Sequence, residues 1–458
     1  MSNRPAAAAA GFPAGMPGTP LPRLLAVSGL AIAIGAATVI EPRIAIALCA
    51  ITLVPILVWT DPRLGFALFA FSLAINVDVL GGPIHVSLPQ LIALAVLAGA
   101  LLRASPRAAA GRSGLWAAGG GVFVLATLPS LIRAVEPGAA MVGILELVIL
   151  STVLAVTVRW MVRRPDTVEP VLAMLVAGAA LTLVPALLQV VFGIGRDAFR
   201  AGGIMRAYAW FSEPNTYGLY LAGIVPIALV LATRRSSLAY AAAATAILLA
   251  LGLTGSRGAW VGTLAGLLAL ALVAFRWRTR TLIAGVACIA GIAAIGWFLP
   301  PELIVARLAL DDWSTQQRLL VLLSTFDGIE RSPILGHGAG SFAAMLSSLA
   351  RAGLVDDVTM PHNLLLDVWF QFGILPLLCL LGFAIAYAFV TGRAARRTGD
   401  LRIAGLFAGV AAMFVASMFG TLFIRGVQET FVLLIALSAA LVRVPSPGAS
   451  NAPEKTDA

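Results

Sequence analysis

One histidine of this sequence stands in a position suited to proton transfer. His362 follows Pro361 and precedes Asn363, and an apolar run begins directly afterwards. Because proline interrupts the preceding chain, we expect His362 in the first turn of a membrane helix. The partial positive charge of a helix N-terminus disfavours imidazolium, and a neutral imidazole can act as a general base. The alternative is a His–Asn pair that only caps the helix.

Three arginines and an asparagine suggest a site for an anion. Arg206 precedes the run Phe211-Ser212-Glu213-Pro214-Asn215, Arg257 lies in a Ser-Arg-Gly turn, and Arg318 lies in the longest loop. The topology argued below places all three on the outer side of a membrane, where cations are disfavoured, which indicates an anionic ligand. Asn215 opens a span, and backbone N–H groups at a helix start bind anions. The alternatives are local pairing with acidic residues and a simple N-cap.

Other kinds of site are less well supported. His337 lies in a glycine-rich turn, Gly336–Gly340, and is a weaker candidate for a direct role, while His85 is expected to be structural. The spacing of these glycines is not a nucleotide signature, because no strand precedes them. The three histidines are far apart and the acidic residues lack ligand spacing, so we expect no metal and no cofactor. No G-x-S-x-G nucleophile motif is present.

The composition indicates a membrane protein. Of the 458 residues, 60% are hydrophobic and only 11% are charged, and the mean hydropathy is +0.98. A water-soluble globule of this size cannot bury so much apolar surface, which excludes a soluble enzyme, a secreted domain and a disordered chain. Long Leu/Ala/Val/Ile runs without alternation favour helices over a β-barrel.

Apolar runs bounded by charges or turn residues predict twelve to fourteen transmembrane helices. The candidate runs are 24–40, 44–60, 64–80, 86–102, 114–132, 139–158, 168–192, 215–233, 238–254, 259–275, 282–299, 363–391, 403–424 and 429–443. Some early runs are short for a span, and neighbouring ones could be re-entrant. We therefore expect an all-α, polytopic integral membrane protein.

The placement of arginine predicts the topology. With the N-terminus in the cytoplasm, every second short loop is basic, as the positive-inside rule requires. The segment 300–362 is then a large, partly helical periplasmic loop that caps the spans. The expected order is a cytoplasmic tail, N-terminal transmembrane helices, central helices with arginine-bearing periplasmic loops, the large loop, C-terminal helices and a cytoplasmic tail (1–23, 24–192, 193–299, 300–362, 363–443 and 444–458).

Five motifs in a fixed order resemble the O-antigen ligase/polymerase superfamily, which contains O-antigen ligases, Wzy-type O-antigen and exopolysaccharide polymerases, and protein O-oligosaccharyltransferases. They are Arg206 with Phe211–Asn215, Gly255–Ala259, Gln317-Arg318, Pro333–Phe342, and Pro361–Asn363 followed by Phe372-Gly373. The resemblance covers roughly residues 190–425, and the N-terminal half resembles the family only as a set of spans. The Glu213-Pro214-Asn215 form departs from the commoner small-residue version, which slightly favours an exopolysaccharide polymerase over a ligase.

This resemblance implies a GT-C-like glycosyltransferase of the bacterial inner membrane, active at the periplasmic face without a metal. The implied donor is a glycan on undecaprenyl pyrophosphate, and the implied acceptor is a glycan or lipid A-core. Membrane lipids surround such a protein, a polysaccharide chain-length regulator is a candidate partner, and no nucleic acid is expected. By position, Arg206, Arg257 and Arg318 match the arginines that hold the pyrophosphate, and His362 matches the base. Asn215, Asn363 and His337 would support them.

Two other functions remain open at this point. A transporter or flippase for an anionic lipid or solute would typically show broken helices or charges near mid-membrane. Such charges are few here, and Glu146 and Asp78 are the notable ones. A non-catalytic subunit of an envelope complex would not need the Arg/His constellation. Ligase and polymerase both use a sugar hydroxyl, so the sequence leaves the choice between them, the sugar, its linkage, the chain length and the oligomeric state open.

Overall fold

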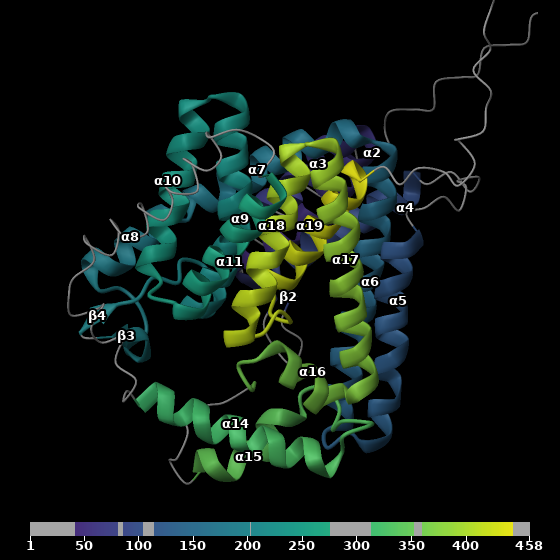
Figure 1. Ribbon diagram of the computed structural model, residues 1–458, viewed down its shortest axis with the longest axis vertical. Helices are drawn as coiled ribbons and strands as arrows, with labels where there is room; N and C mark the ends of the chain where they lie inside the picture. Colours follow the sequence, from purple (N-terminus) through teal and green to yellow (C-terminus); the bar gives the residue numbers. More distant parts are fainter. Residues whose placement is uncertain are drawn as a thin grey trace, which may run out of the picture.

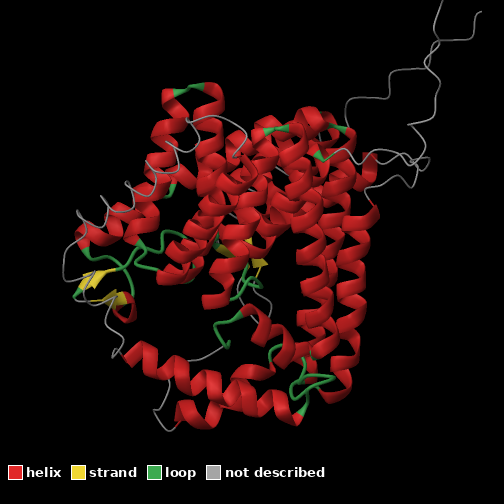
Figure 2. Ribbon diagram, viewed as in Figure 1, coloured by secondary structure: helices red, strands yellow, loops and turns green. Residues whose placement is uncertain are grey.

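The computed structural model describes residues 42–80, 86–103, 114–201, 203–274, 313–351 and 360–442. Helices dominate these residues, and the strands form two small antiparallel hairpins (Figure 2). Several predictions lie outside the described residues, namely the tails 1–23 and 444–458, the spans 24–40 and 282–299, and His85.

The described residues form the following elements. The α-helices are α2 (Pro42–Thr60), α3 (Pro62–Ser72), α4 (Leu88–Arg103), α5 (Gly114–Thr127), α6 (Pro137–Arg163), α7 (Val168–Leu181), α8 (Leu183–Phe192), α9 (Pro214–Arg235), α10 (Leu238–Leu253), α11 (Arg257–Ala274), α14 (Trp313–Arg331), α15 (Ser341–Arg351), α16 (Leu364–Phe372), α17 (Ile374–Thr398), α18 (Leu401–Ala416) and α19 (Val427–Leu441). The 3₁₀ helices are η1 (Leu128–Arg133), η2 (Pro165–Thr167), η3 (Asp197–Phe199) and η4 (Ser417–Phe419), and the strands are β1 (Asp78–Leu80), β2 (Val86–Ser87), β3 (Arg200–Ala201) and β4 (Ile204–Met205).

Many of these helices are long and apolar enough to cross a membrane. Within the described ranges, seven segments meet both conditions, and they are Leu115–Arg133, Pro137–Arg163, Pro165–Phe192, Pro214–Arg235, Arg257–Ala274, Ile374–Thr398 and Leu401–Phe419. Four shorter apolar helices accompany them, Leu48–Thr60, Leu88–Ala100, Leu238–Leu253 and Val427–Leu441. The prediction of an all-α polytopic membrane protein is confirmed.

Two of the predicted runs do not form single spans. The run 64–80 gives only the 11 residues of α3 before the chain turns into β1. The run 363–391 is divided at Gly373, which has a φ of 87°, into α16 and α17. A Cβ atom at Gly373 would lie 1.9 Å from the carbonyl oxygen of Ile334, so only glycine allows this close approach. The prediction that His362 begins a membrane helix is therefore wrong, because the nine residues of α16 are too few to span a bilayer.

The centre of the helical bundle is α9. Within its apolar window 83% of the residues are buried, and it contacts α7, α10, α11 and α18. The neighbouring pair α11 and α18 packs closely through small residues: a Cβ atom at Gly262 would lie 2.5 Å from the carbonyl oxygen of Ala412. Small residues of this kind let membrane helices approach at their backbones. The helices that carry the site are thus held by a tightly packed core.

The described part of the predicted large loop is helical and lies across one end of the bundle. In Figure 1, α14 and α15 lie at the bottom, below α11 and α18 and beside the lower ends of the long helices α5, α6 and α17, with α16 above them. The turn 333–340 attaches this cap to the end of α16. In it, the backbone N–H of His337 donates to the carbonyl oxygen of Phe370 at 3.0 Å, and that of Gly338 donates to Gln371 at 2.8 Å.

Charged residues gather at the other end of α9. Glu169 on α7 accepts hydrogen bonds from Arg234, from Arg235 at 2.9 Å and from Arg402 at 3.1 Å. Arg63 pairs with Asp166 in the same way. The pairs of Glu169 join α7, α9 and α18, whereas that of Arg63 joins α3 to η2. The topology argument assigns all these arginines to the cytoplasmic side.

Candidate active site

Arg206 lies where an extended segment meets the starts of two helices. Its backbone continues β4, and the next residue, Ala207, donates to the carbonyl oxygen of Leu253 at the end of α10. The guanidinium is buried: Nε donates to the carbonyl oxygen of Thr254 at 2.9 Å, and Nη2 donates to Oδ1 of Asn215 at 2.9 Å. The predicted proximity of Arg206 and Asn215 is therefore present, at the first turn of α9.

Arg257 belongs to the same neighbourhood, as the first residue of α11. The turn before it contains Gly255, with a φ of 57°, and Thr254, whose carbonyl accepts from Arg206. The starts of α9 and α11 are in contact, because a Cβ atom at Gly218 would lie 3.0 Å from that of Ser256. Two helix N-termini and the guanidinium of Arg206 thus concentrate positive charge in one region, to which Arg257 adds a residue at the start of α11, and this is the electrostatic requirement for holding an anion.

His362 has a strained backbone, with a φ of 54°. This left-handed conformation is uncommon for residues other than glycine, and such strain tends to occur at functional sites. The adjacent Asn363 caps α16, because its Oδ1 accepts from the backbone N–H groups of Leu365 and Leu366, each at 3.1 Å. The cap holds His362 at the start of the helix.

The short helix η4 connects His362 to Arg257. Nδ2 of Asn363 donates to the carbonyl oxygen of Met418 at 3.2 Å. The next residue, Phe419, packs against the start of α11. A Cβ atom added at Gly258 would lie 2.5 Å from the Cβ atom of Phe419. The candidate base and the two arginines are thus linked through two consecutive residues of η4, although they are far apart in the sequence.

The two remaining candidates belong to the cap. Arg318 lies on α14, which contacts α16, and its side chain is outside the described part of the chain. His337 is buried, its Nε2 lies 2.8 Å from the carbonyl oxygen of Gly328, and its ring centroid lies 4.9 Å from that of Phe370. The geometry gives His337 a structural role inside the cap.

Comparison with known proteins identifies the central part of the chain. Residues 241–381 match the family model described as O-Antigen ligase. This segment is similar to the O-antigen ligase family. It contains Arg257, Arg318, His337, His362 and Asn363, and the Arg206–Asn215 pair lies just before it. No curated protein matches the chain. For this multi-pass membrane protein, the match supports a ligase- or polymerase-type function in polysaccharide biosynthesis.

A polar cavity of about 550 Å³ adjoins the O-antigen ligase motifs. Its polar lining consists of Glu146 on α6, Asp367 and Gln371 on α16, and Thr421 and Gln428 near α19. The sequence showed Glu146 only as a mid-span charge and gave no reason to select the others. The only feature of the sequence that could have indicated them is that polar side chains are rare in membrane helices, where they often belong to functional sites.

Asp367 is the most deeply buried acid of this cavity, with 2% of its surface exposed. Oδ2 accepts from the hydroxyl of Thr421 at 2.9 Å, and Oδ1 accepts from Nε2 of Gln371 at 2.5 Å. Burial raises the pKa of Asp367 to about 6, and these two hydrogen bonds offset only part of that rise. The carboxyl therefore changes its charge close to the physiological pH range.

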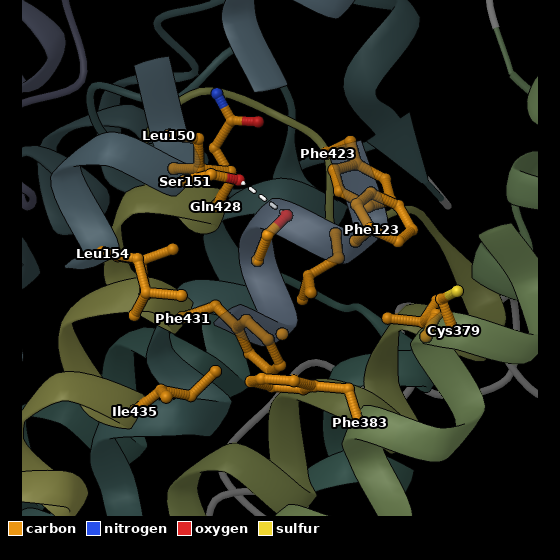
Figure 3. A pocket seen from close by; sticks show the side chains of 15 residues that line it. Phe123, Leu150, Ser151, Leu154, Cys379, Phe383, Phe423, Gln428, Phe431 and Ile435 are labelled. Atoms are coloured by element: carbon orange, nitrogen blue, oxygen red, sulfur yellow. Dashed lines mark hydrogen bonds between the residues drawn. The ribbon is translucent and has the colours of Figure 1, made fainter. Parts of the chain in front are cut away.

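An apolar pocket lies deeper in the bundle, between α5, α6, α17 and α19. Figure 3 shows the rings of Phe383 and Phe431 beside each other, with Leu154 and Ile435 nearby. Phe423 and Gln428 line both this pocket and the polar cavity. The two spaces are therefore neighbours.

Proposed function

We propose that this protein transfers a glycan from an undecaprenyl-pyrophosphate donor to a sugar hydroxyl at the periplasmic face of the inner membrane. The observation that supports this proposal is the junction at η4, where the starts of α9 and α11 meet the segment that carries His362. An anion-binding region and a candidate base are the two parts that the transfer needs.

The arginines serve the donor. The guanidinium fork of Arg206, together with Arg257 and Arg318, holds the pyrophosphate and stabilises the negative charge that develops as it leaves. Contacts to Thr254 and Asn215 fix the plane of the Arg206 fork before the donor arrives. Because this positive charge is built into the protein, the proposed reaction needs no divalent metal.

His362 serves the acceptor. Its neutral imidazole accepts the hydroxyl proton while the hydroxyl oxygen forms a bond to the anomeric carbon of the donor glycan. The bond from that carbon to the pyrophosphate oxygen breaks in the same reaction, and undecaprenyl pyrophosphate leaves with the bonding electron pair. The acceptor is a glycan, as in a polymerase, or lipid A-core, as in a ligase, and a chain-length regulator is the proposed protein partner of a polymerase.

The test is transfer by the purified protein in lipid nanodiscs. A synthetic undecaprenyl-pyrophosphate oligosaccharide and a short glycan acceptor are supplied in excess EDTA, and the product is identified by mass spectrometry. We expect a lengthened glycan and released undecaprenyl pyrophosphate. Loss of turnover in EDTA that a divalent cation restores would contradict the arginine-based mechanism. The same protein is also reconstituted into proteoliposomes of the same lipid composition. Movement of the donor across their membrane, without any new glycosidic bond, would instead favour a flippase.

A further inference from the structure

The polar cavity has the chemistry of a sugar site. Its lining combines the carboxyl groups of Glu146 and Asp367 with the carboxamides of Gln371 and Gln428. Each sugar hydroxyl both donates and accepts hydrogen bonds, and carboxyl and carboxamide groups provide both partners. The volume of about 550 Å³ falls in the range of small-molecule pockets, about 300–1,000 Å³.

The charge of the cavity distinguishes it from the anion-binding region. No arginine, lysine or histidine is among the described residues that line it. Arg425 is paired with Glu146 of this lining, because its Nη2 lies 3.5 Å from Oε1 of Glu146, and its Nη1 lies 3.8 Å from Oδ1 of Asp78. A pyrophosphate would be repelled by this lining, whereas an uncharged sugar would not.

The position of the cavity places an occupant beside the candidate base. Met360, two residues before His362, forms part of the wall, and Asp367 stands on the short helix that Asn363 caps. Glu146 comes from the opposite wall, on α6. Thr421 of the cavity wall lies two residues after Phe419, which packs against the start of α11, so the cavity and the anion-binding region both adjoin η4.

We propose that this cavity is the subsite for the sugar that carries the accepting hydroxyl. This inference rests on the proposed transfer reaction and adds to it the location and the recognising residues of the acceptor. Glu146, Gln371 and Gln428 act as positioning residues that orient the hydroxyl toward His362. They have no part in holding the pyrophosphate.

Gly138 offers a way to block the cavity without disturbing the fold. It is the second residue of α6 and lines the cavity, and a Cβ atom there would meet no atom within 4 Å. Gly138→Leu therefore places an isobutyl group in the cavity, and leucine is a better helix former than glycine. Gly382 on α17 is the matched control, because it is also helical and its Cβ would also meet nothing, but it does not line the cavity.

The experiment measures the acceptor KM, the kcat and the donor affinity for the wild type, Gly138→Leu, Gly382→Leu and Glu146→Gln. We expect Gly138→Leu and Glu146→Gln to raise the acceptor KM roughly tenfold or more, with the donor Kd unchanged. Gly382→Leu should behave as the wild type. An unchanged acceptor KM in both cavity variants would overturn the inference, and so would a weakened donor Kd, which would show that the cavity holds the donor. A wild type that makes no product would instead contradict the proposed function.

Discussion

The side-chain amide of Asn363 donates a hydrogen bond to the carbonyl oxygen of Met418, at 3.2 Å, while its oxygen caps α16. One side chain thus fixes the segment containing His362 to the end of α18. Because Phe419 packs on the start of α11, this bond also sets the position of His362 relative to Arg257. We expect the geometry of the site to depend on this connection more than on the cap helices below it.

Replacing His362 with glycine should lower the transfer rate without lowering the thermal stability. Glycine adopts a φ of 54° without strain, so His362→Gly should unfold at the same temperature as the wild type or higher. Loss of a general base should lower the transfer rate by about 10²–10⁴. The measurements are thermal unfolding in detergent and transfer with the lipid-linked donor, and added imidazole should restore part of the rate.

Two comparison variants sharpen this prediction. His362→Ala keeps the left-handed backbone under strain and should unfold at a lower temperature than His362→Gly, with an equally low rate. Asn363→Ala removes a helix cap, which costs about 1 kcal/mol, and should affect the rate less than either. Transfer by His362→Gly at a rate near that of the wild type would show that another group removes the proton.

Arg206 and Arg257 should not be replaceable by lysine. A lysine at position 206 cannot reproduce the fork that contacts both Thr254 and Asn215. Arg206→Lys and Arg257→Lys should each lower transfer roughly a hundredfold and weaken donor binding. The exposed Arg196 lies in the same loop as Arg206, and Arg196→Lys is the control that should stay active. Normal donor binding in both lysine variants would mean that net charge alone matters.

The stability of the protein should depend on pH through Asp367. Because burial raises the pKa of Asp367 to about 6, above the value near 4 of an unfolded chain, the folded state holds a proton that the unfolded state has lost between these values. Stability contributed by this group therefore falls as pH rises from about 4 to 6 and is constant above.

Asp367→Asn mimics the protonated acid and removes this dependence. The hydroxyl of Thr421 can rotate to accept from the new amide, and the bond from Gln371 is kept. The difference in Tm between Asp367→Asn and the wild type should grow from pH 4 to pH 6 in favour of the variant and then level off. Asp327→Asn, at an exposed pair with Arg331, is the control for general effects of charge removal. A difference in Tm that is the same at all pH values would contradict the prediction.

The cap should face the periplasm. In a chain without Cys49, Cys288 and Cys379, cysteines are introduced one at a time at the exposed Ala343 on α15 and at the exposed Thr398, at the far end of α17. A membrane-impermeant maleimide should label Ala343→Cys in cells with a permeable outer membrane, and Thr398→Cys only after lysis. The reverse pattern would invert the topology.

The sequence predicted the helices well because, in a membrane, a long apolar run must satisfy its backbone hydrogen bonds internally, and a helix does so. It failed where a run was broken by backbone contacts that hydropathy does not record. Gly373 is one residue in a long apolar run, and at its positive φ its backbone lies against the carbonyl oxygen of Ile334, which belongs to the cap. Nothing local distinguishes it from Gly382, which lies in an uninterrupted part of α17.

The candidate site also contains one part that the sequence could predict and one that it could not. Arg206 and Asn215 are nine residues apart, and their contact could be predicted from that spacing. The polar cavity could not be predicted, because Glu146, Asp367 and Gln428 come from three helices and are brought together only by the packing of the bundle. One or two polar residues in a helix carry no pattern that identifies their partners on other helices.

The attachment of the turn 333–340 also has a consequence for biosynthesis. The N–H of Val135, just before α6, donates to the carbonyl oxygen of His337, and His337 in turn donates to Phe370. The ribosome makes Val135 long before either partner, and the partner on α16 last of all. The loop between α5 and α6 therefore reaches its final hydrogen bonding only after residue 337 has been made, and the turn that it binds is completed only after residue 370. Completion of the cap is a late step in the maturation of this protein.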